Sequence, residues 1–256
     1  QIFLFLYLGL DLVMDLVIDV GNTQIKFAVF DENIMVYSSA TKAHEVILEF
    51  NHITQKFPDL QYGIISSTAE TSSELVLTMK KQIKLIEFSH ESKINFINSY
   101  KTPKTLGLDR IALVAAAAEI YPNAHVLVID AGTCITYDFK TKENIYKGGV
   151  ISPGLQMRFK AMHSFTQKLP RIQDVTKSSK YIGKSTREAM QIGVYKSICY
   201  EIDGYIEDYL TDYEDLTVVL TGGDYNLLEA SIKNTIFATS NFLFIGLHKI
   251  LQLNIN

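Results

Sequence analysis

The chain of 256 residues is long enough for one large domain or two of average size, and 47% of its residues are hydrophobic. This composition excludes a disordered or low-complexity protein. With 24 Lys and Arg against 28 Asp and Glu, the net charge is -4, so the basic excess typical of nucleic-acid-binding proteins is absent. Two cysteines are too few for a disulfide framework, which favours a reduced, cytoplasmic protein.

The first twenty residues begin with an apolar stretch that suggests a membrane segment. The uninterrupted part is too short to span a bilayer, and three aspartates interrupt the rest. A basic region and a cleavage site of small residues are both absent, which argues against a signal peptide. We expect residues 1–13 to be an extension outside the fold, with Met14 as the natural start. The alternatives are an extra edge strand or a loose interfacial segment.

The most informative feature of the chain is an internal repeat. The first copy reads Leu-Val-Ile-Asp-Val-Gly-Asn-Thr from residue 16, and the second, 111 residues later, reads Leu-Val-Ile-Asp-Ala-Gly-Thr. Strand-like runs follow over 25–30 and 135–139, so each copy predicts a β-hairpin. Two such hairpins predict two similar domains, 14–115 and 116–256, with the boundary inside a helix that packs on both.

Strands and helices alternate in the rest of the chain. Short strands are expected at 62–66 and 216–220. Helical spacing of apolar residues, or a run of alanines, predicts four helices, over 71–83, 110–121, 186–209 and 243–251. The fold class is therefore α/β.

Each repeated turn places a carboxylate and backbone amides at the end of a buried strand. Glycine allows close backbone approach, outward N–H groups can hold an anion, and carboxylate oxygens suit Mg²⁺. One such turn is weak support for function, because Asp and Gly are ordinary turn residues. Two turns in register favour a nucleotide site over two solvated β-turns. A third turn, Thr221-Gly222-Gly223, lets a flat base or ribose lie against the backbone.

The segment Gly107-Leu108-Asp109-Arg110 stands at the start of the alanine-rich helix. A helix N-terminus favours an ionised carboxylate, so Asp109 can serve as a base. The guanidinium of Arg110 can clamp a carboxylate substrate. The alternative is a helix-capping aspartate beside a solvated arginine.

Two other patterns have structural interpretations. Gly183-Lys184-Ser185 is similar to the end of a P-loop, but the required earlier glycine and the preceding strand are absent, so we expect it to begin a helix. The six histidines show no metal-ligand spacing, and we expect them to be surface or packed residues.

Taken in order, these motifs make the chain resemble the type III pantothenate kinases, within the superfamily of acetate and sugar kinases, actin and heat-shock ATPases. The resemblance covers residues 14–256, and the Gly-x-Asp-Arg element distinguishes this family from its cousins. The motifs that carry it are Asp19 to Thr23, Gly107 to Arg110, Asp130 to Thr133, Gly148-Gly149 through Pro153-Gly154, and Leu220 to Gly223. It implies two ribonuclease-H-like domains of the actin and sugar-kinase type, with the active site in the cleft between them.

The resemblance also implies an activity and its requirements. The expected reaction is the ATP-dependent phosphorylation of pantothenate, the first step of coenzyme A synthesis. The expected enzyme is a cytoplasmic homodimer that needs Mg²⁺ and a monovalent cation, K⁺ or NH₄⁺. Neither a nucleic acid nor a membrane is an expected partner.

Roles for individual residues follow from the same resemblance. Asp109 is the expected proton acceptor, Asp130 the ligand of the monovalent cation, and Asp19 the ligand of Mg²⁺ through water. The expected pantothenate contacts are Tyr100, Gly107, Leu108, Asp109, Arg110 and Thr186. The expected ATP contacts are Asp19, Val20, Gly21, Asn22, Thr23, Gln24, Ile25, Lys26 and Thr133.

Two other functions stay open. A nucleotide-binding accessory or regulatory homologue would lack turnover, and the intact Asp109–Arg110 pair argues against it. A ribonuclease-H-like nuclease would use Asp19 and Asp130 as a two-metal pair, and the acidic composition argues against that. Pantothenate-dependent release of ADP tests the first alternative, and cleavage of an RNA–DNA hybrid tests the second.

Overall fold

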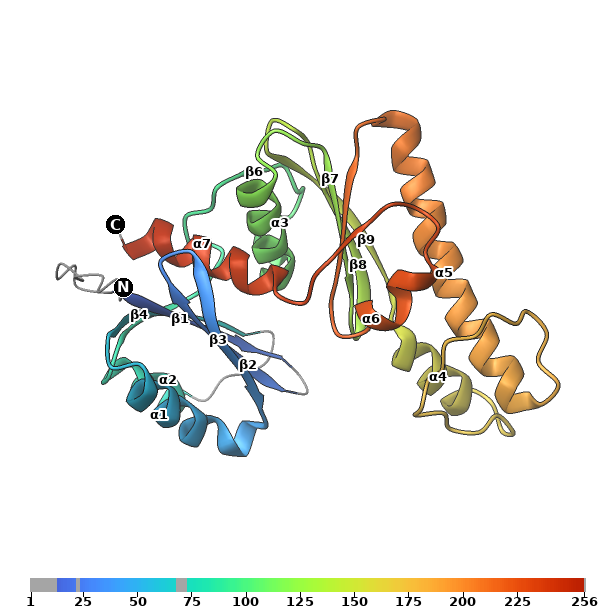
Figure 1. Cartoon of the computed structure of the whole chain (residues 1–256), viewed down its shortest axis with the longest axis horizontal. Helices are drawn as coiled ribbons and strands as arrows, with labels where there is room; N and C mark the ends of the chain where they lie inside the picture. The colour runs from blue at the N-terminus through green and yellow to red at the C-terminus, as the bar shows by residue number, and fades with distance from the viewer. Residues whose placement is uncertain (1–12, 22–23, 68–72, 256) are drawn as a thin grey trace, which may run out of the picture. The chain divides into compact units, whose positions relative to one another are not determined.

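The fold is known from a computed structural model, which describes residues 13–21, 24–67 and 73–255 (Figure 1). Asn22 and Thr23 of the first turn lie outside the described residues. Residues 1–12 of the expected extension lie outside them as well.

The chain divides into two compact units. Unit 1 comprises 1–95, 104–112 and 244–256, and unit 2 comprises 96–103 and 113–243. These units are not contiguous, unlike the expected domains 14–115 and 116–256, because two segments join the other half. The strand β6 (Ile97–Asn98) pairs with the sheet of unit 2, and most of the last helix, α7 (Phe242–Ile255), belongs to unit 1.

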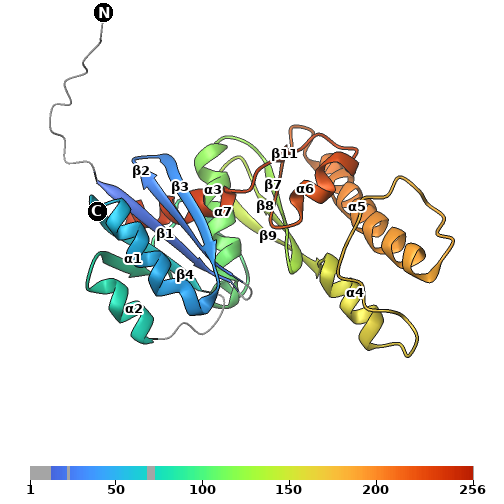
Figure 2. The ribbon, with the colours of Figure 1, turned by 60° about the horizontal axis from the view of Figure 1, so that its bottom comes forward.

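Unit 1 is built on a five-stranded sheet in the order β3-β2-β1-β4-β5 (Figure 2). The central strand β1 runs antiparallel to β2 and parallel to β4. The strands are β1 (Met14–Val20), β2 (Ile25–Asp31), β3 (Ile34–Thr41), β4 (Leu60–Ser67) and β5 (Lys84–Glu87). Two helices, α1 (Val46–Lys56), preceded by the 3-10 turn Ala43–Glu45, and α2 (Ser73–Lys80), complete the described part of this half.

Alternation along β1 separates two kinds of environment. Leu16 and Ile18 are fully buried in one apolar core with Phe50 of α1 and Met79 of α2. Because successive side chains point to opposite faces, Asp15 and Asp19 lie on the other face. There His248 of α7 stacks on Phe30 and lies 2.9 Å from a carboxylate oxygen of Asp15, so this buried pair ties the last helix to the sheet.

Unit 2 has a six-stranded sheet in the order β11-β10-β7-β8-β9-β6. Its first five strands repeat the arrangement of unit 1, with β7 and β8 in the places of β1 and β2. The strands are β7 (Val126–Ala131), β8 (Cys134–Lys140), β9 (Ile145–Pro153), β10 (Thr217–Thr221) and β11 (Phe237–Ala238). This topology confirms the predicted repeat and the α/β fold class.

The core of unit 2 lies between one face of this sheet and two helices. Ile129 and Tyr137 pack there with Phe159 of α4 (Leu155–Ser164) and with Ile198 of α5 (Thr186–Asp212). The remaining elements are the helices α3 (Leu108–Ile120) and α6 (Tyr225–Leu228), and the 3-10 turns Pro103–Thr105 and Glu229–Ser231.

The helix predictions are confirmed, with shifted ends. The first, expected over 71–83, spans only Ser73–Lys80 in the described chain, and α3 begins two residues before the expected start. Before α5, the Ser185 hydroxyl accepts the N–H of Glu188, and the Glu188 carboxylate accepts the N–H of Lys184 (2.8 Å). These two hydrogen bonds, which cap the first turn of α5, confirm that the P-loop-like residues begin a helix. No helix in the described part of the chain has the length and apolarity to cross a membrane.

Candidate active site

The first repeated turn joins β1 to β2 at one end of the unit 1 sheet. Gly21 donates its N–H to the carbonyl of Gln24 (3.1 Å), and a Cβ atom on Gly21 would lie only 3.2 Å from that oxygen. Val20 and Ile25 are buried at the two ends of the turn, whereas Gln24 and Lys26 are exposed. The turn therefore has a fixed base and presents polar groups to solvent.

Asp19 is a buried carboxylate at this turn. It pairs in register with Lys26 of β2, and only 9% of the residue is exposed. Burial raises the pKa of Asp19 to about 6; the positive charge of Lys26 opposes this shift, and the negative charge of Asp109 adds to it. A cation bound here would offset the cost of burying the ionised group.

The candidate base occupies the first turn of α3. One Asp109 carboxylate oxygen accepts the N–H of Arg110 (2.8 Å), and a Cβ atom on Gly107 would overlap that same oxygen. Glycine at 107 therefore leaves room for the carboxylate. The Arg110 residue is only 5% exposed, so the alternative of a solvated arginine is wrong.

Asp109 contributes to the raised pKa of Asp19, although ninety positions separate the two residues in the sequence. Both belong to unit 1. The structure thus brings the expected magnesium ligand and the expected proton acceptor into one electrostatic environment.

Sequence reasoning missed Ser66 and named Thr221 only as part of a glycine turn, although both are hydroxyl residues beside the repeated aspartates. Ser66 of β4 pairs in register with Asp19, and Thr221 of β10 pairs with Asp130. Both hydroxyl residues are buried. The sequence holds a usable pattern, because a strand that is parallel to the first hairpin strand follows later in each repeat. The hydroxyl residues can be recognised from it only when the pairing of these distant strands is known.

The second repeated turn has similar geometry and one residue fewer. Gly132 donates its N–H to the carbonyl of Cys134 (3.0 Å), and Thr133 is exposed. Gly222 has a φ of +97° and lies so close to this hairpin that a Cβ atom would overlap Asp130 and Ala131. The Thr-Gly-Gly turn is therefore packed against Asp130, and only glycine fits at 222.

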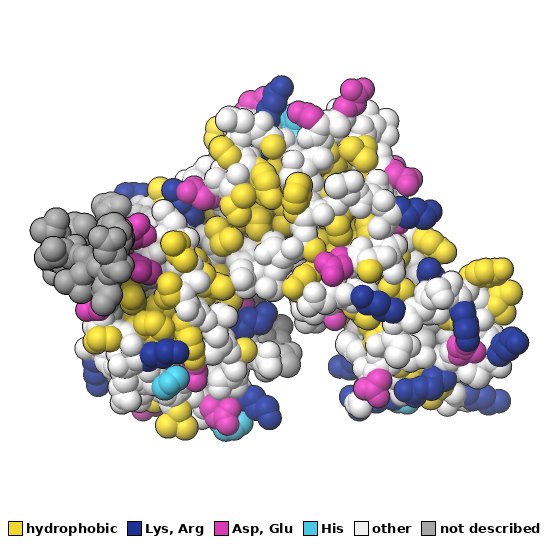
Figure 3. Space-filling view, viewed as in Figure 1, with side chains coloured by type: hydrophobic (Ala, Val, Ile, Leu, Met, Phe, Trp, Pro, Cys, Tyr) yellow, Lys and Arg dark blue, Asp and Glu magenta, His cyan; other side chains and the backbone are white. Residues whose placement is uncertain are grey.

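The other expected pantothenate contacts in unit 2 lie at two places. Tyr100 stacks on Tyr146 with ring centroids 6.0 Å apart, and its ring lies 3.5 Å from a Cβ position on Gly148. Thr186 is the exposed first residue of α5. Lysines and arginines gather around α4 and the start of α5 (Figure 3), and the exposed ones are Lys160, Lys168, Arg171, Lys177, Lys180, Lys184 and Arg187.

Among the residues that the structure describes, no three His, Cys, Asp or Glu side chains form a metal-binding group. The candidate cation ligands are single carboxylates, Asp19 and Asp130. Mg²⁺ commonly takes one or two protein carboxylates and fills its other positions with water and phosphate oxygens. The donor set at Asp19 therefore fits a magnesium ion that arrives with a nucleotide.

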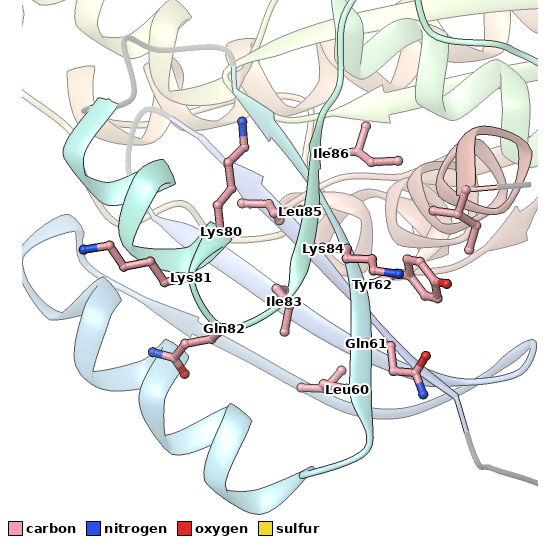
Figure 4. A pocket seen from close by; sticks show the side chains of 11 residues that line it. Leu60, Gln61, Tyr62, Lys80, Lys81, Gln82, Ile83, Lys84, Leu85 and Ile86 are labelled. Carbon is pink, nitrogen blue, oxygen red and sulfur yellow. The ribbon is translucent and has the colours of Figure 1, made fainter.

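A cavity of about 840 Å³ lies elsewhere, at the β4–β5 edge of unit 1 (Figure 4). None of the predicted site residues line it. Two of the three lysines that line it have partners: Lys80 forms a salt bridge with Glu87 (2.6 Å), and Lys84 lies over the Tyr62 ring. Lys84 also lies on the edge strand β5, where a charged residue discourages sheet-to-sheet association.

Comparison with known proteins adds independent information. A sequence model of the family of type III pantothenate kinases matches residues 15–208. The type III pantothenate kinase of Christiangramia forsetii is 46% identical over 241 residues, which cover 94% of this chain and 99% of that protein. The protein of the same name from Flavobacterium johnsoniae is 41% identical over 243 residues, which cover 95% and 99% of the two chains.

Solved structures are similar over the whole chain as well. A Campylobacter jejuni protein described as a Baf-family transcriptional activator is 25% identical, with a TM-score of 0.62, and the match covers 94% of this chain and 99% of that one. An inorganic polyphosphate/ATP-glucomannokinase from Arthrobacter is 12% identical, with a TM-score of 0.50 and coverage of 95% and 99%. The second likeness concerns the fold alone and agrees with the predicted sugar-kinase type.

Proposed function

Because the chain belongs to the type III pantothenate kinase family, we propose that it transfers the terminal phosphate of ATP to the hydroxyl group of pantothenate, the first step of coenzyme A synthesis. The observation that carries the proposal is that the candidate base Asp109 lies close enough to Asp19 of the phosphate turn for its negative charge to help raise the pKa of Asp19. Phosphoryl transfer asks a protein mainly for alignment and charge neutralisation. Asp109 would align the hydroxyl group, and Lys26 with a cation held at Asp19 would neutralise the charge of the phosphates.

The first turn binds the phosphates of ATP. Of the described residues of this turn, Gln24 and Lys26 are exposed, and Lys26 provides positive charge for the phosphates. When bound, Mg²⁺ supplies charge neutralisation for the phosphates. Asp19 would hold it through water, because the buried carboxylate is stabilised by a nearby cation. The roles of Asn22 and Thr23 rest on the family resemblance alone.

Asp109 accepts the proton of the pantothenate hydroxyl. It is half-buried at the N-terminus of α3, where the helix dipole favours a negative charge. General base catalysis by such a group contributes about 10²–10⁴ in rate.

Pantothenate is an anion, and its carboxylate suits a guanidinium. Arg110 binds it with charge-assisted hydrogen bonds, which are strong here because Arg110 is shielded from water. Gly107, Leu108, Tyr100 and Thr186 complete the substrate contacts. The basic surface around α4 and the start of α5 supports the placement of an anionic substrate at Thr186.

Asp130 holds the monovalent cation, and Thr133 contacts ATP. Asp130 lies beside the backbone of Gly222 and Ala131, and carboxylate and carbonyl oxygens are the ligands that hard cations prefer.

We place the enzyme in the cytoplasm as a homodimer. Its two cysteines, Cys134 and Cys199, are free thiols, as in reducing compartments. Phe165 and Tyr181 of unit 2 are 88% and 82% exposed, and large apolar side chains in solvent are typical of interaction surfaces. Light scattering of the purified protein measures the oligomeric state, and a monomer at micromolar concentration would contradict the dimer.

A coupled assay of ADP release tests the activity. ADP should form only when ATP, Mg²⁺ and pantothenate are all present, and the product should be pantothenate with one added phosphate. The accessory or regulatory alternative predicts a different outcome: ATP would raise the unfolding temperature, but pantothenate would not increase ADP release.

A further inference from the structure

A buried polar network in unit 2 has no role in the function described so far. Tyr137 of β8 donates its hydroxyl to Glu201 of α5 (2.9 Å), and Glu201 forms a salt bridge with Arg158 of α4. The side chains of Arg158 and Glu201 are 16% and 22% exposed. The pair is therefore largely shielded from water, unlike an ordinary surface ion pair.

Arg158 uses its other donors to hold the junction between β9 and α4. Its Nε donates to the carbonyl of Pro153 (2.8 Å), and its Nη2 donates to the hydroxyl of Ser152 (3.0 Å). The Nη1 atom donates to the hydroxyl of Ser197 on α5 (3.3 Å). A planar guanidinium can satisfy these directions at once, whereas a lysine ammonium cannot.

The junction between β9 and α4 that Arg158 holds is in backbone contact with the second repeated turn. Gly154 donates its N–H to the carbonyl of Thr133 (3.1 Å). A Cβ atom on Gly154 would overlap the carbonyl oxygens of Gly132 and Thr133, so the two backbones are in close contact. Any shift of Pro153 and Gly154 is therefore transmitted to Thr133.

We propose that Arg158 is a positioning residue for ATP: with Glu201 and Tyr137 as its anchor, it fixes the β9–α4 junction and thereby the conformation of the Gly132–Thr133 turn. This inference rests on the proposed function, because it takes Thr133 as a nucleotide contact. Arg158 itself contacts the Glu201 carboxylate and backbone and hydroxyl groups of the protein, and it acts on ATP only through them.

The test compares two variants with a matched control. Arg158→Ala removes the charge and all of its hydrogen bonds. Arg158→Lys keeps a positive charge next to Glu201 but cannot donate hydrogen bonds to Pro153 and Ser152 at the same time. Lys142→Ala removes one exposed charge in the turn between β8 and β9 of the same unit, away from the basic surface around α4, and serves as the control.

Both variants of Arg158 should raise the KM for ATP about tenfold, the change expected when the displaced Gly132–Thr133 turn loses one hydrogen bond to a charged phosphate. The KM for pantothenate should stay within about twofold, and Lys142→Ala should behave as the wild type. Arg158→Lys should unfold at nearly the wild-type temperature. Should Arg158→Ala fail to fold, Arg158→Lys and Glu201→Gln carry the comparison.

Calorimetric titration with a non-hydrolysable ATP analogue should give the same tenfold loss of affinity. This readout does not depend on turnover, so failure of the kinase assay and failure of the positioning role are distinguishable. Wild-type ATP affinity in Arg158→Lys would overturn the proposal, as would an equal rise of both KM values.

Discussion

Replacement of Asp19 by asparagine should change the stability of the fold and the kinase activity in opposite directions. Burial raises the pKa of Asp19 from 3.8 to about 6, so the folded protein holds this proton more tightly than the unfolded chain. A change of one in pKa corresponds to about 1.4 kcal/mol. The ionised Asp19 carboxylate therefore destabilises the unliganded fold by about 3 kcal/mol at neutral pH. The cost is absent below pH ~4, grows as the pH rises to ~6, and is constant above.

Asp19→Asn removes this cost but buries an amide whose hydrogen bonds are incomplete, which costs about 1–2 kcal/mol. We therefore expect the free energy of unfolding at pH 7.5 to rise by about 1–2 kcal/mol. The variant should also lose the fall in stability that the wild type shows between pH 4 and 6. Kinase activity should drop sharply, because the carboxylate that holds Mg²⁺ is gone.

Urea denaturation without nucleotide, at pH 4.5 and pH 7.5, measures the effect. Asp15→Asn is a matched control on the same strand and face, because Asp15 already has a buried partner in His248. That substitution should not stabilise the protein. An Asp19→Asn variant no more stable than the wild type at pH 7.5 would refute the reasoning.

Two further predictions concern the substrate and the monovalent cation. Arg110→Ala should raise the KM for pantothenate about ten- to a hundredfold, because a charge-assisted contact is lost, and should leave ATP affinity within about twofold. Steady-state kinetics with each substrate varied in turn measures both effects. An equal rise of the KM values for pantothenate and ATP would contradict the prediction. Turnover should fall when K⁺ is replaced by Na⁺ or Li⁺, and Asp130→Asn should remove the difference between the ions. A wild-type enzyme with equal turnover in all three ions would exclude Asp130 as the ligand of an activating cation.

The sequence predicted those parts of the fold and site that depend on neighbouring residues. Each hairpin is local, because its two strands and its glycine turn lie within about fifteen residues. The equivalence of Asp19 and Asp130 followed from the repeat and holds in the register of both sheets. The start of α3 at Gly107 to Arg110 could be predicted for the same reason.

The parts that escaped prediction depend on residues far apart in the chain. The Asp15–His248 pair joins β1 to α7 across 233 positions, and hydrophobic periodicity does not select such partners. Lys140 is another case, since its position at the end of a strand suggests exposure. Its ammonium group is buried and donates to the carbonyls of Tyr121 and Ala124 and to the side chain of Asn144.

The network around Arg158 was missed for a related reason. Its members come from β8, α4 and α5, and each alone looks like an ordinary polar residue on an amphipathic element. The close approach of Gly154 to Thr133 depends on how the helix after β9 returns to the hairpin. Such contacts follow from tertiary packing and not from local pattern.

The central claim is that Asp109 is the base in a pantothenate kinase. The decisive measurement is the kcat of pantothenate-dependent phosphorylation for the wild type and Asp109→Asn, with product identified by mass and ATP affinity measured separately. Asparagine keeps the size and much of the hydrogen bonding of Asp109 but cannot accept the proton. The account predicts a kcat lower by about two to four orders of magnitude with ATP affinity nearly unchanged. Near-wild-type turnover in Asp109→Asn would contradict it.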